Sequence, residues 1–186
     1  MKKIAVFASG NGSNFQAIID EIEKGGLVAE IAALVTDNPA CFAVERAQHH
    51  NIPVFSVVPK NYSSKEEYEK DIAFFLIEKN VSLIVLAGYM RLIGNVLLSA
   101  FYNRIINIHP ALLPAFPGKN SIQQAYQYGV KIFGVTVHYV DAGIDTGKII
   151  AQECFKADGT ETLQEIERKI HCIEYQLYSK VIKQIL

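Results

Sequence analysis

The sequence predicts an α/β protein, a three-layer sandwich in which helices cover both faces of a mostly parallel sheet. Short apolar runs rich in Val and Ile alternate with segments of helical periodicity along most of the chain. Such continuous apolar strands are typical of a parallel sheet that is buried on both faces. A chain of 186 residues has the size of one domain, so we expect residues 1–186 to form a single Rossmann-like domain.

The N-terminal half is expected to alternate strands with helices. In the first helix the apolar residues recur at intervals of three and four, which places them on one buried face. Strands are predicted at residues 4–9, 31–36, 53–58 and 82–88, and helices at 13–24, 41–50 and 64–79.

The C-terminal half is expected to complete the parallel sheet and to add an antiparallel edge. Gly129 is expected to end a helix, and Thr160 or Thr162 to cap the last helix with Glu165 in its first turns. The elements are predicted as a strand at 104–110, a helix at 121–129, an antiparallel pair at 133–141 and 147–155, and a final helix at 160–186.

Composition argues against disorder, against a nucleic-acid partner and against a membrane partner. Half of the residues are hydrophobic, 20% are charged and the net charge is −1. The three cysteines have neither a disulfide framework nor metal-ligand spacing, so we expect a reduced, cytoplasmic setting and no metal. No window approaches a membrane span, and the apolar run after the N-terminal lysines is interpreted as a first strand rather than a signal peptide.

Four segments that follow strands are expected to form one site. In parallel α/β sheets, ligands bind in the crevice beyond the carboxyl ends of the strands. The segments are SGNGSN at 9–14, AGYMRLI at 87–93, NIHPALLP at 107–114 and VDAGIDTG at 140–147.

The first of these segments has the features of a phosphate-binding loop. Gly10 and Gly12 allow main-chain N–H groups to approach an anion, and the helix that follows adds free N–H donors and the positive end of its dipole. Ser13 and Asn14 add side-chain donors. An ordinary strand-to-helix turn with Ser13 as the helix cap is the alternative.

A dinucleotide site is a weaker alternative for the same loop. Phe15 stands where the fingerprint requires a third glycine, and its bulk opposes close packing of helix and strand. Asp37 follows the second strand, where a ribose-binding acid belongs, but TDNP is also an ordinary turn sequence. The polar residues after the glycines better suit a single phosphate monoester.

Asn107, His109 and Asp145 form a candidate acid–base group. Asn107 and His109 are two residues apart in a strand, so their side chains emerge on the same face at its carboxyl end. A carboxylate such as Asp145 favours the charged imidazole, and an amide can donate to a developing oxyanion. With no Ser or Cys nucleophile in the group, transfer between two bound substrates is favoured. A structural histidine is the alternative for His109, and His138 is expected to be a sheet residue.

The same residues resemble the formyltetrahydrofolate-dependent formyltransferase family. SGNGSN, LAGYMRL, NIHPALLP and DAGIDTG follow one another in the order typical of that family, and the similarity extends over essentially the whole chain. NIHP and LLP with a downstream Asp are shared by the wider family. GNGSN is more specific for members that formylate glycinamide ribonucleotide in purine synthesis.

The resemblance implies roles for individual residues. It implies that Asn107, His109 and Asp145 are catalytic, and that Gly12, Ser13 and Asn14 bind the ribonucleotide phosphate. It also implies that Glu174 contacts the glycinamide substrate, the alternative being a solvated helix acid. Folate binding is implied for Lys65, Met90, Arg91, Leu92, Ile93 and Asn107. Lys65 stands where relatives often carry Arg, and Ile122 stands where many carry His.

The implied reaction uses small molecules only. The amine of glycinamide ribonucleotide attacks the formyl carbon of the co-substrate 10-formyltetrahydrofolate, and no metal takes part. Other acceptors, hydrolysis of formyltetrahydrofolate by water, and a nucleotide-binding module without catalysis are the competing functions. The exposed edge hairpin and tyrosine-rich surface are compatible with a homodimer.

Overall fold

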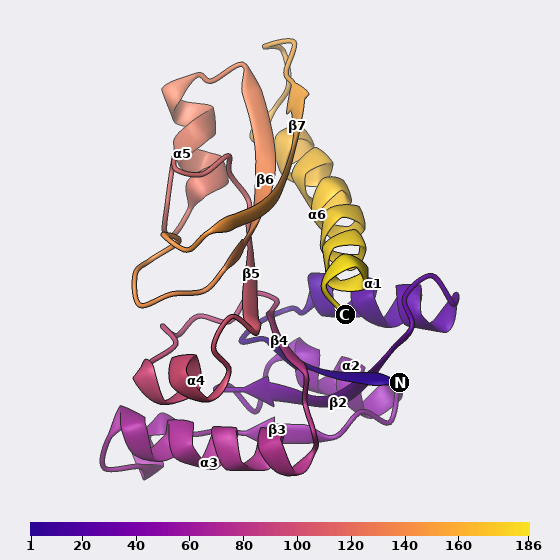
Figure 1. The fold of residues 1–186 in the computed structure, drawn as a ribbon. Coiled ribbons are helices and arrows are strands. Elements are labelled where there is room, and N and C mark those ends of the chain that lie inside the picture. Colours follow the sequence, from indigo (N-terminus) through magenta and orange to yellow (C-terminus); the bar gives the residue numbers. More distant parts are fainter.

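The computed structural model describes all 186 residues, Met1 to Leu186, and contains seven strands and six α-helices (Figure 1). The strands are β1 (Lys2–Phe7), β2 (Ala29–Thr36), β3 (Val54–Ser56), β4 (Leu83–Leu86), β5 (Ile105–His109), β6 (Ile132–Tyr139) and β7 (Ile149–Lys156). The helices are α1 (Ser13–Glu23), α2 (Phe42–His49), α3 (Lys65–Glu78), α4 (Asn95–Ala100), α5 (Ser121–Tyr128) and α6 (Leu163–Ile185), with a 3₁₀ turn at Pro59–Asn61.

All seven strands form one sheet in the order β3-β2-β1-β4-β5-β6-β7. The pairs from β3 to β5 are parallel, whereas β5–β6 and β6–β7 are antiparallel. This confirms the predicted mostly parallel sheet with an antiparallel edge. No helix is long and apolar enough to cross a membrane.

Two apolar clusters hold the helices against the two faces of the sheet. One cluster joins the sheet to α1, α2, α5 and α6, and Phe15, Ile18 and Ile19 of α1 lie in it as their spacing predicts. The other joins the sheet to α3 and α4. Each face is therefore covered, which explains why the strands read as continuous apolar runs.

Helix boundaries follow the capping residues. Thr162 and Glu165 form a reciprocal capping box at the start of α6, and Gly129 ends α5 at φ 82°. Both were expected. The short helix α4 was not predicted, because its N-terminus is held by a carboxylate from far away in the sequence: Glu69 of α3 accepts a hydrogen bond from the Gly94 N–H at 2.6 Å.

One cross-sheet row positions the candidate site. Val35, Phe7, Leu86, Asn107 and His138 are neighbours in register on β2, β1, β4, β5 and β6. Neighbours in register point to the same face. The first three are buried in the cluster under α3 and α4. The row therefore changes from apolar to polar where it reaches the open end of β5.

Candidate active site

Asn107, His109, His138 and Asp145, here called the polar cluster, lie together at the carboxyl end of β5. Asp145 Oδ2 is 3.3 Å from His109 Nδ1, and Asp145 Oδ1 is 3.5 Å from His138 Nε2. Asn107 Nδ2 donates to Asp145 Oδ1 at 3.4 Å and lies 3.2 Å from His138 Nε2. The carboxylate therefore joins one amide and two imidazoles from three segments.

His109 has an acceptor at each ring nitrogen. Its Nε2 lies 2.8 Å from the carbonyl oxygen of Phe116, which can only accept, so Nε2 carries a proton. Its Nδ1 faces the Asp145 carboxylate. Two acceptors on one ring suit the imidazolium form, in which both nitrogens donate. The buried ring is thus held in orientation at both nitrogens.

Asp145 is held ionised in the loop between β6 and β7. Burial by itself would raise its pKa. The hydrogen bond with His138, the Gly118 N–H at 2.8 Å and the charges of both imidazoles outweigh burial, so the pKa lies below its usual range. The loop that carries Asp145 needs Gly147, because a Cβ there would collide with the Tyr139 carbonyl oxygen. Asp145 itself adopts φ 55°, a region that few residues with side chains occupy.

His138 lies in β6, so the prediction of a sheet residue is confirmed. Its side chain also contacts the candidate site, which the sequence does not indicate. It lies directly opposite Asn107 in the antiparallel pair, so both side chains emerge on the polar face. The signal for this contact is the register of β5 with β6, which the sequence does not specify.

The α1 loop, Gly10–Asn14, leaves hydrogen-bonding groups without partners. No protein group accepts a hydrogen bond from the main-chain N–H of Ser13, Asn14 or Phe15, and α1 has no side-chain cap. The alternative in which Ser13 caps α1 is therefore wrong, since Gly12 occupies the cap position at φ 73°. Asn14 Oδ1 is buried and has no partner. This end of α1 has the features of an anion site.

Gly12 and Arg46 fix the shape of this loop from α2. A Cβ on Gly12 would lie 2.8 Å from the Cβ of Ala43, so only glycine allows α1 to approach α2 this closely. Arg46 donates from Nε to the Asn11 carbonyl at 2.9 Å and from Nη1 to Gln16 at 3.0 Å. No motif in the sequence pointed to Arg46.

The residues for which folate binding is implied, Met90–Ile93, form an exposed segment after β4, here called the folate segment. Met90 and Leu92 are 65% and 56% exposed, whereas Ile93 is buried. The main-chain groups of Arg91 and Leu92 make no hydrogen bond within the protein. Apolar side chains thus flank free main-chain donors and acceptors, which suits a flat heterocycle with polar edges.

The implied folate residue Lys65 lies beside the end of this segment. A Cβ built on Gly94 would meet Lys65 Cε at 2.9 Å, and Lys65 Nζ is 3.9 Å from Glu69 Oε1. Glu69 is almost fully buried and also accepts from Gly94. Lys65 thus starts α3 at the point where Glu69 holds the folate segment in place.

Glu174 is not a solvated helix acid, because only 4% of it is exposed. It accepts a hydrogen bond from His171 Nδ1 at 2.7 Å, and this bond raises the pKa of His171. One turn further along α6, the Tyr178 hydroxyl donates to the carbonyl of Leu86 at 2.8 Å and of Ile106 at 3.1 Å. These bonds tie α6 to the carboxyl end of β4 and to β5.

Comparison with known proteins identifies the family. A model described as formyl transferase matches residues 2–182. The chain belongs to the formyl transferase family. It is 52% identical over 186 residues to phosphoribosylglycinamide formyltransferase of Bacillus subtilis, covering 100% of this chain and 95% of that protein. It is 38% identical over 183 residues to the enzyme of that name from Haemophilus influenzae, covering 98% and 86%.

Solved structures of formyl transferases agree with this assignment. The crystal structure of glycinamide ribonucleotide transformylase 1 from Geobacillus kaustophilus has a TM-score of 0.96 at 50% identity, covering 100% of this chain and 99% of that one. Phosphoribosylglycinamide formyltransferase from Bacillus halodurans has a TM-score of 0.95 at 49% identity, covering 100% and 95%. The family resemblance in the sequence is confirmed.

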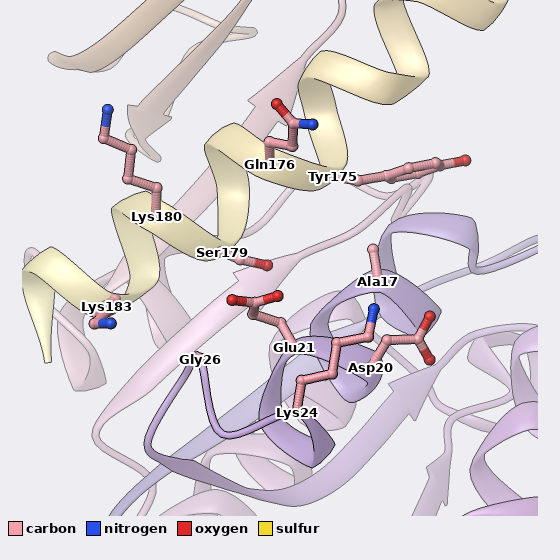
Figure 2. Close-up of a pocket in the computed structure, with 10 residues that line it drawn as sticks. All are labelled: Ala17, Asp20, Glu21, Lys24, Gly26, Tyr175, Gln176, Ser179, Lys180 and Lys183. Atoms are coloured by element: carbon pink, nitrogen blue, oxygen red, sulfur yellow. The ribbon is translucent and has the colours of Figure 1, made fainter.

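A polar cleft of about 510 Å³ in this formyl transferase lies outside the candidate site, between α1 and α6 (Figure 2). Figure 2 shows Glu21 extending from α1 toward α6, where the buried Ser179 hydroxyl has no partner. Three lysines and two acids line the cleft, and none of the implied site residues does. Tyr175, the residue next to Glu174, and Ala17, in the second turn of α1, both line it.

Proposed function

We propose that the protein transfers the formyl group of 10-formyltetrahydrofolate to the amine of glycinamide ribonucleotide, giving formylglycinamide ribonucleotide and tetrahydrofolate. The observation that carries the proposal is the polar cluster at the open end of the sheet, in a chain 52% identical over its whole length to the Bacillus subtilis enzyme. The polar cluster supplies the charge that formyl transfer needs. The α1 loop and the folate segment supply one binding region for each substrate.

Charge develops on the formyl oxygen when the amine attacks. The tetrahedral intermediate carries a negative oxygen, and a preorganised cation with hydrogen-bond donors in a water-poor site stabilises it. In the proposal His109 is that cation, compensated by Asp145 at 3.3 Å before substrate binds. Since the charge and its orientation exist in advance, little reorganisation accompanies the reaction.

Asn107 is the proposed second donor to this oxygen. Its Nδ2 is directed toward His138 at 3.2 Å and Asp145 at 3.4 Å, both long for hydrogen bonds. One N–H can therefore turn to the formyl oxygen at small cost. Asp145 then accepts from the remaining N–H and keeps the amide in place.

Two proton movements complete the reaction. The attacking amine loses a proton and the departing folate nitrogen gains one, so the site must accept a proton and return it. Asp145 is ionised at neutral pH, as its lowered pKa indicates, and is the proposed acceptor, with water carrying the proton to the folate nitrogen. No metal takes part in any step of this scheme.

We assign the substrates to regions where hydrogen-bonding groups have no partner within the protein. The ribonucleotide phosphate is proposed at Gly12, Ser13 and Asn14, where α1 keeps free N–H donors. Glu174 is the proposed contact for the glycinamide part. The folate is proposed along Met90–Ile93, with Lys65 and Asn107 as further contacts.

These small molecules are the proposed partners, in the cytoplasm and without nucleic acid or membrane. Edge strand β7 is the proposed surface for a homodimer.

The test is an assay of purified protein with 10-formyltetrahydrofolate and candidate acceptors. Tetrahydrofolate release that requires glycinamide ribonucleotide, with the formylated product identified by mass, supports the proposal. Release without any acceptor indicates the hydrolase instead, and no release contradicts formyl transfer. His109→Ala should abolish most of the rate, whereas His49→Ala, at an exposed histidine at the end of α2, should not.

A further inference from the structure

Asp37 is an acid that the proposed function does not use. It follows β2 directly, and its side chain is only 11% exposed. The sequence suggested it as a ribose-binding acid of a dinucleotide site. Both of its oxygens are occupied within the protein, however: Oδ1 accepts from the Ser9 hydroxyl at 2.5 Å and Oδ2 accepts from Arg91 Nε at 2.8 Å. Each oxygen of Asp37 therefore already serves a contact within the protein.

Ser9 connects this acid to the folate segment a second time. The Ser9 hydroxyl has one proton, which it gives to Asp37, and so it presents a lone pair to the Met90 N–H at 2.9 Å. The Ser9 N–H also donates to the Gly88 carbonyl at 3.1 Å. Asp37 thus fixes Arg91 directly and Met90 through the orientation of one hydroxyl.

The hydrogen bonds of Ser9 and Asp37 join the carboxyl ends of three strands. Ser9 follows β1, Asp37 follows β2, and Met90 and Arg91 follow β4. The far end of the folate segment is held by Glu69, which accepts from the Gly94 N–H. An otherwise exposed segment is thereby fixed at both ends by a carboxylate with little exposure, and its free main-chain groups are kept in one arrangement.

We infer that Asp37 is a positioning residue for the folate co-substrate, acting through Ser9 and Arg91 on the folate segment. The inference rests on the proposed function, because it assigns the Met90–Ile93 segment to folate. It adds a residue that contacts no substrate but sets the geometry of those that do. Its effect is on folate binding, since the polar cluster and Asn14 have no contact with it.

Asp37→Asn is the informative variant because it keeps the size of the side chain. An amide offers one oxygen and one NH₂ group, so either Ser9 or Arg91 faces a donor instead of an acceptor. Loss of one charge-assisted hydrogen bond predicts a rise of about tenfold in KM for 10-formyltetrahydrofolate. KM for glycinamide ribonucleotide and kcat should stay within about twofold of wild type, because neither the ribonucleotide-binding groups nor the polar cluster loses a contact.

The control is Asp158→Asn, an exposed aspartate whose side chain makes no hydrogen bond or ion pair. Ser9→Ala should raise the same KM, and Ser9→Ala with Asp37→Asn should raise it by less than the product of the two. An unchanged folate KM in Asp37→Asn, or an equal rise in both KM values, would overturn the inference.

A binding measurement separates this inference from the proposed acceptor. Calorimetric titration of tetrahydrofolate into wild type and Asp37→Asn needs no acceptor and no turnover. A weaker dissociation constant in Asp37→Asn, with unchanged thermal unfolding, supports the positioning role even if another amine proves to be the acceptor. Equal dissociation constants contradict it.

Discussion

In the polar cluster each side chain has a partner within the protein, whereas the α1 loop leaves several groups without one. His109 has acceptors at both ring nitrogens, and Asp145 receives contacts from Asn107, Gly118 and two imidazoles. Asn14 Oδ1, by contrast, is buried without a partner beside an uncapped helix start. Both regions lie at the carboxyl ends of strands in one sheet.

This difference distinguishes the residues that take part in the chemistry from the residues that bind substrate. Groups that must stabilise charge in a transition state work best when their charge and orientation are set in advance. Groups that must hold a ligand keep hydrogen-bonding capacity which the ligand then completes. The comparison predicts that substitutions in the polar cluster change kcat and that substitutions in the α1 loop change KM.

The largest effect is expected from Asp145→Ala. Without the carboxylate, His109 loses the charge that compensates it and Asn107 loses a contact, so kcat should fall by about 10²-fold or more. KM for glycinamide ribonucleotide should change little. Steady-state rates of tetrahydrofolate release measure both, and a kcat within fivefold of wild type would break the comparison.

Gly12→Ala should give the next largest effect, in the other region. The left-handed φ of 73° and the 2.8 Å approach to Ala43 oppose any side chain, so the loop must shift. KM for glycinamide ribonucleotide should rise about tenfold, and unfolding free energy should fall by about 1–3 kcal/mol. Gly10→Ala is the matched control, because a Cβ there meets nothing within 4 Å. Equal loss of stability in both variants would contradict the steric argument.

His138→Gln sharpens the comparison within the polar cluster. Glutamine can still hydrogen-bond Asn107 but removes the second imidazole from Asp145, so kcat should fall by about tenfold, less than in Asp145→Ala. Thermal unfolding serves as the folding control. If kcat is unchanged, His138 is only a sheet residue, as the sequence suggested.

The smallest effect is on stability in acid. The pKa of Asp145 in the folded protein lies below its usual value, so its ionised form stabilises the fold above the unfolded-state pKa of about 3.9. That contribution is lost as pH falls through the folded pKa. Asp145→Asn should therefore be less stable than wild type at pH 7, with the difference shrinking toward pH 3. Denaturant unfolding at several pH values measures this difference in unfolding free energy. A difference between the variant and wild type that grows in acid would contradict an ionised Asp145 paired with the imidazoles.

Much of the fold was predictable because local signals agreed with tertiary packing. Apolar runs predicted the strands. Gly129 ends α5 and Thr162 caps α6, as expected. One strand differs from its prediction and one helix was not predicted, each for a physical reason. The strand predicted at 53–58 is shorter, at Val54–Ser56, since β3 is an edge strand with one partner. Helix α4 is only six residues long and depends on Glu69 from another helix.

The candidate site was predictable only in part. Alternation within β5 placed Asn107 and His109 together, and the glycines marked the loops. Contacts between distant segments were not predictable, because they depend on register and helix packing. His138, Arg46 and Asp37 are of this kind: each makes at least one contact with a residue 31 or more positions away.

The division between chemistry and binding is tested most directly in His109→Ala. The measurement is the dissociation constant of glycinamide ribonucleotide, by calorimetry without folate, compared with wild type. We expect an unchanged dissociation constant in a folded variant whose kcat has fallen by about 10²-fold or more. Binding that weakens in parallel with kcat would contradict it.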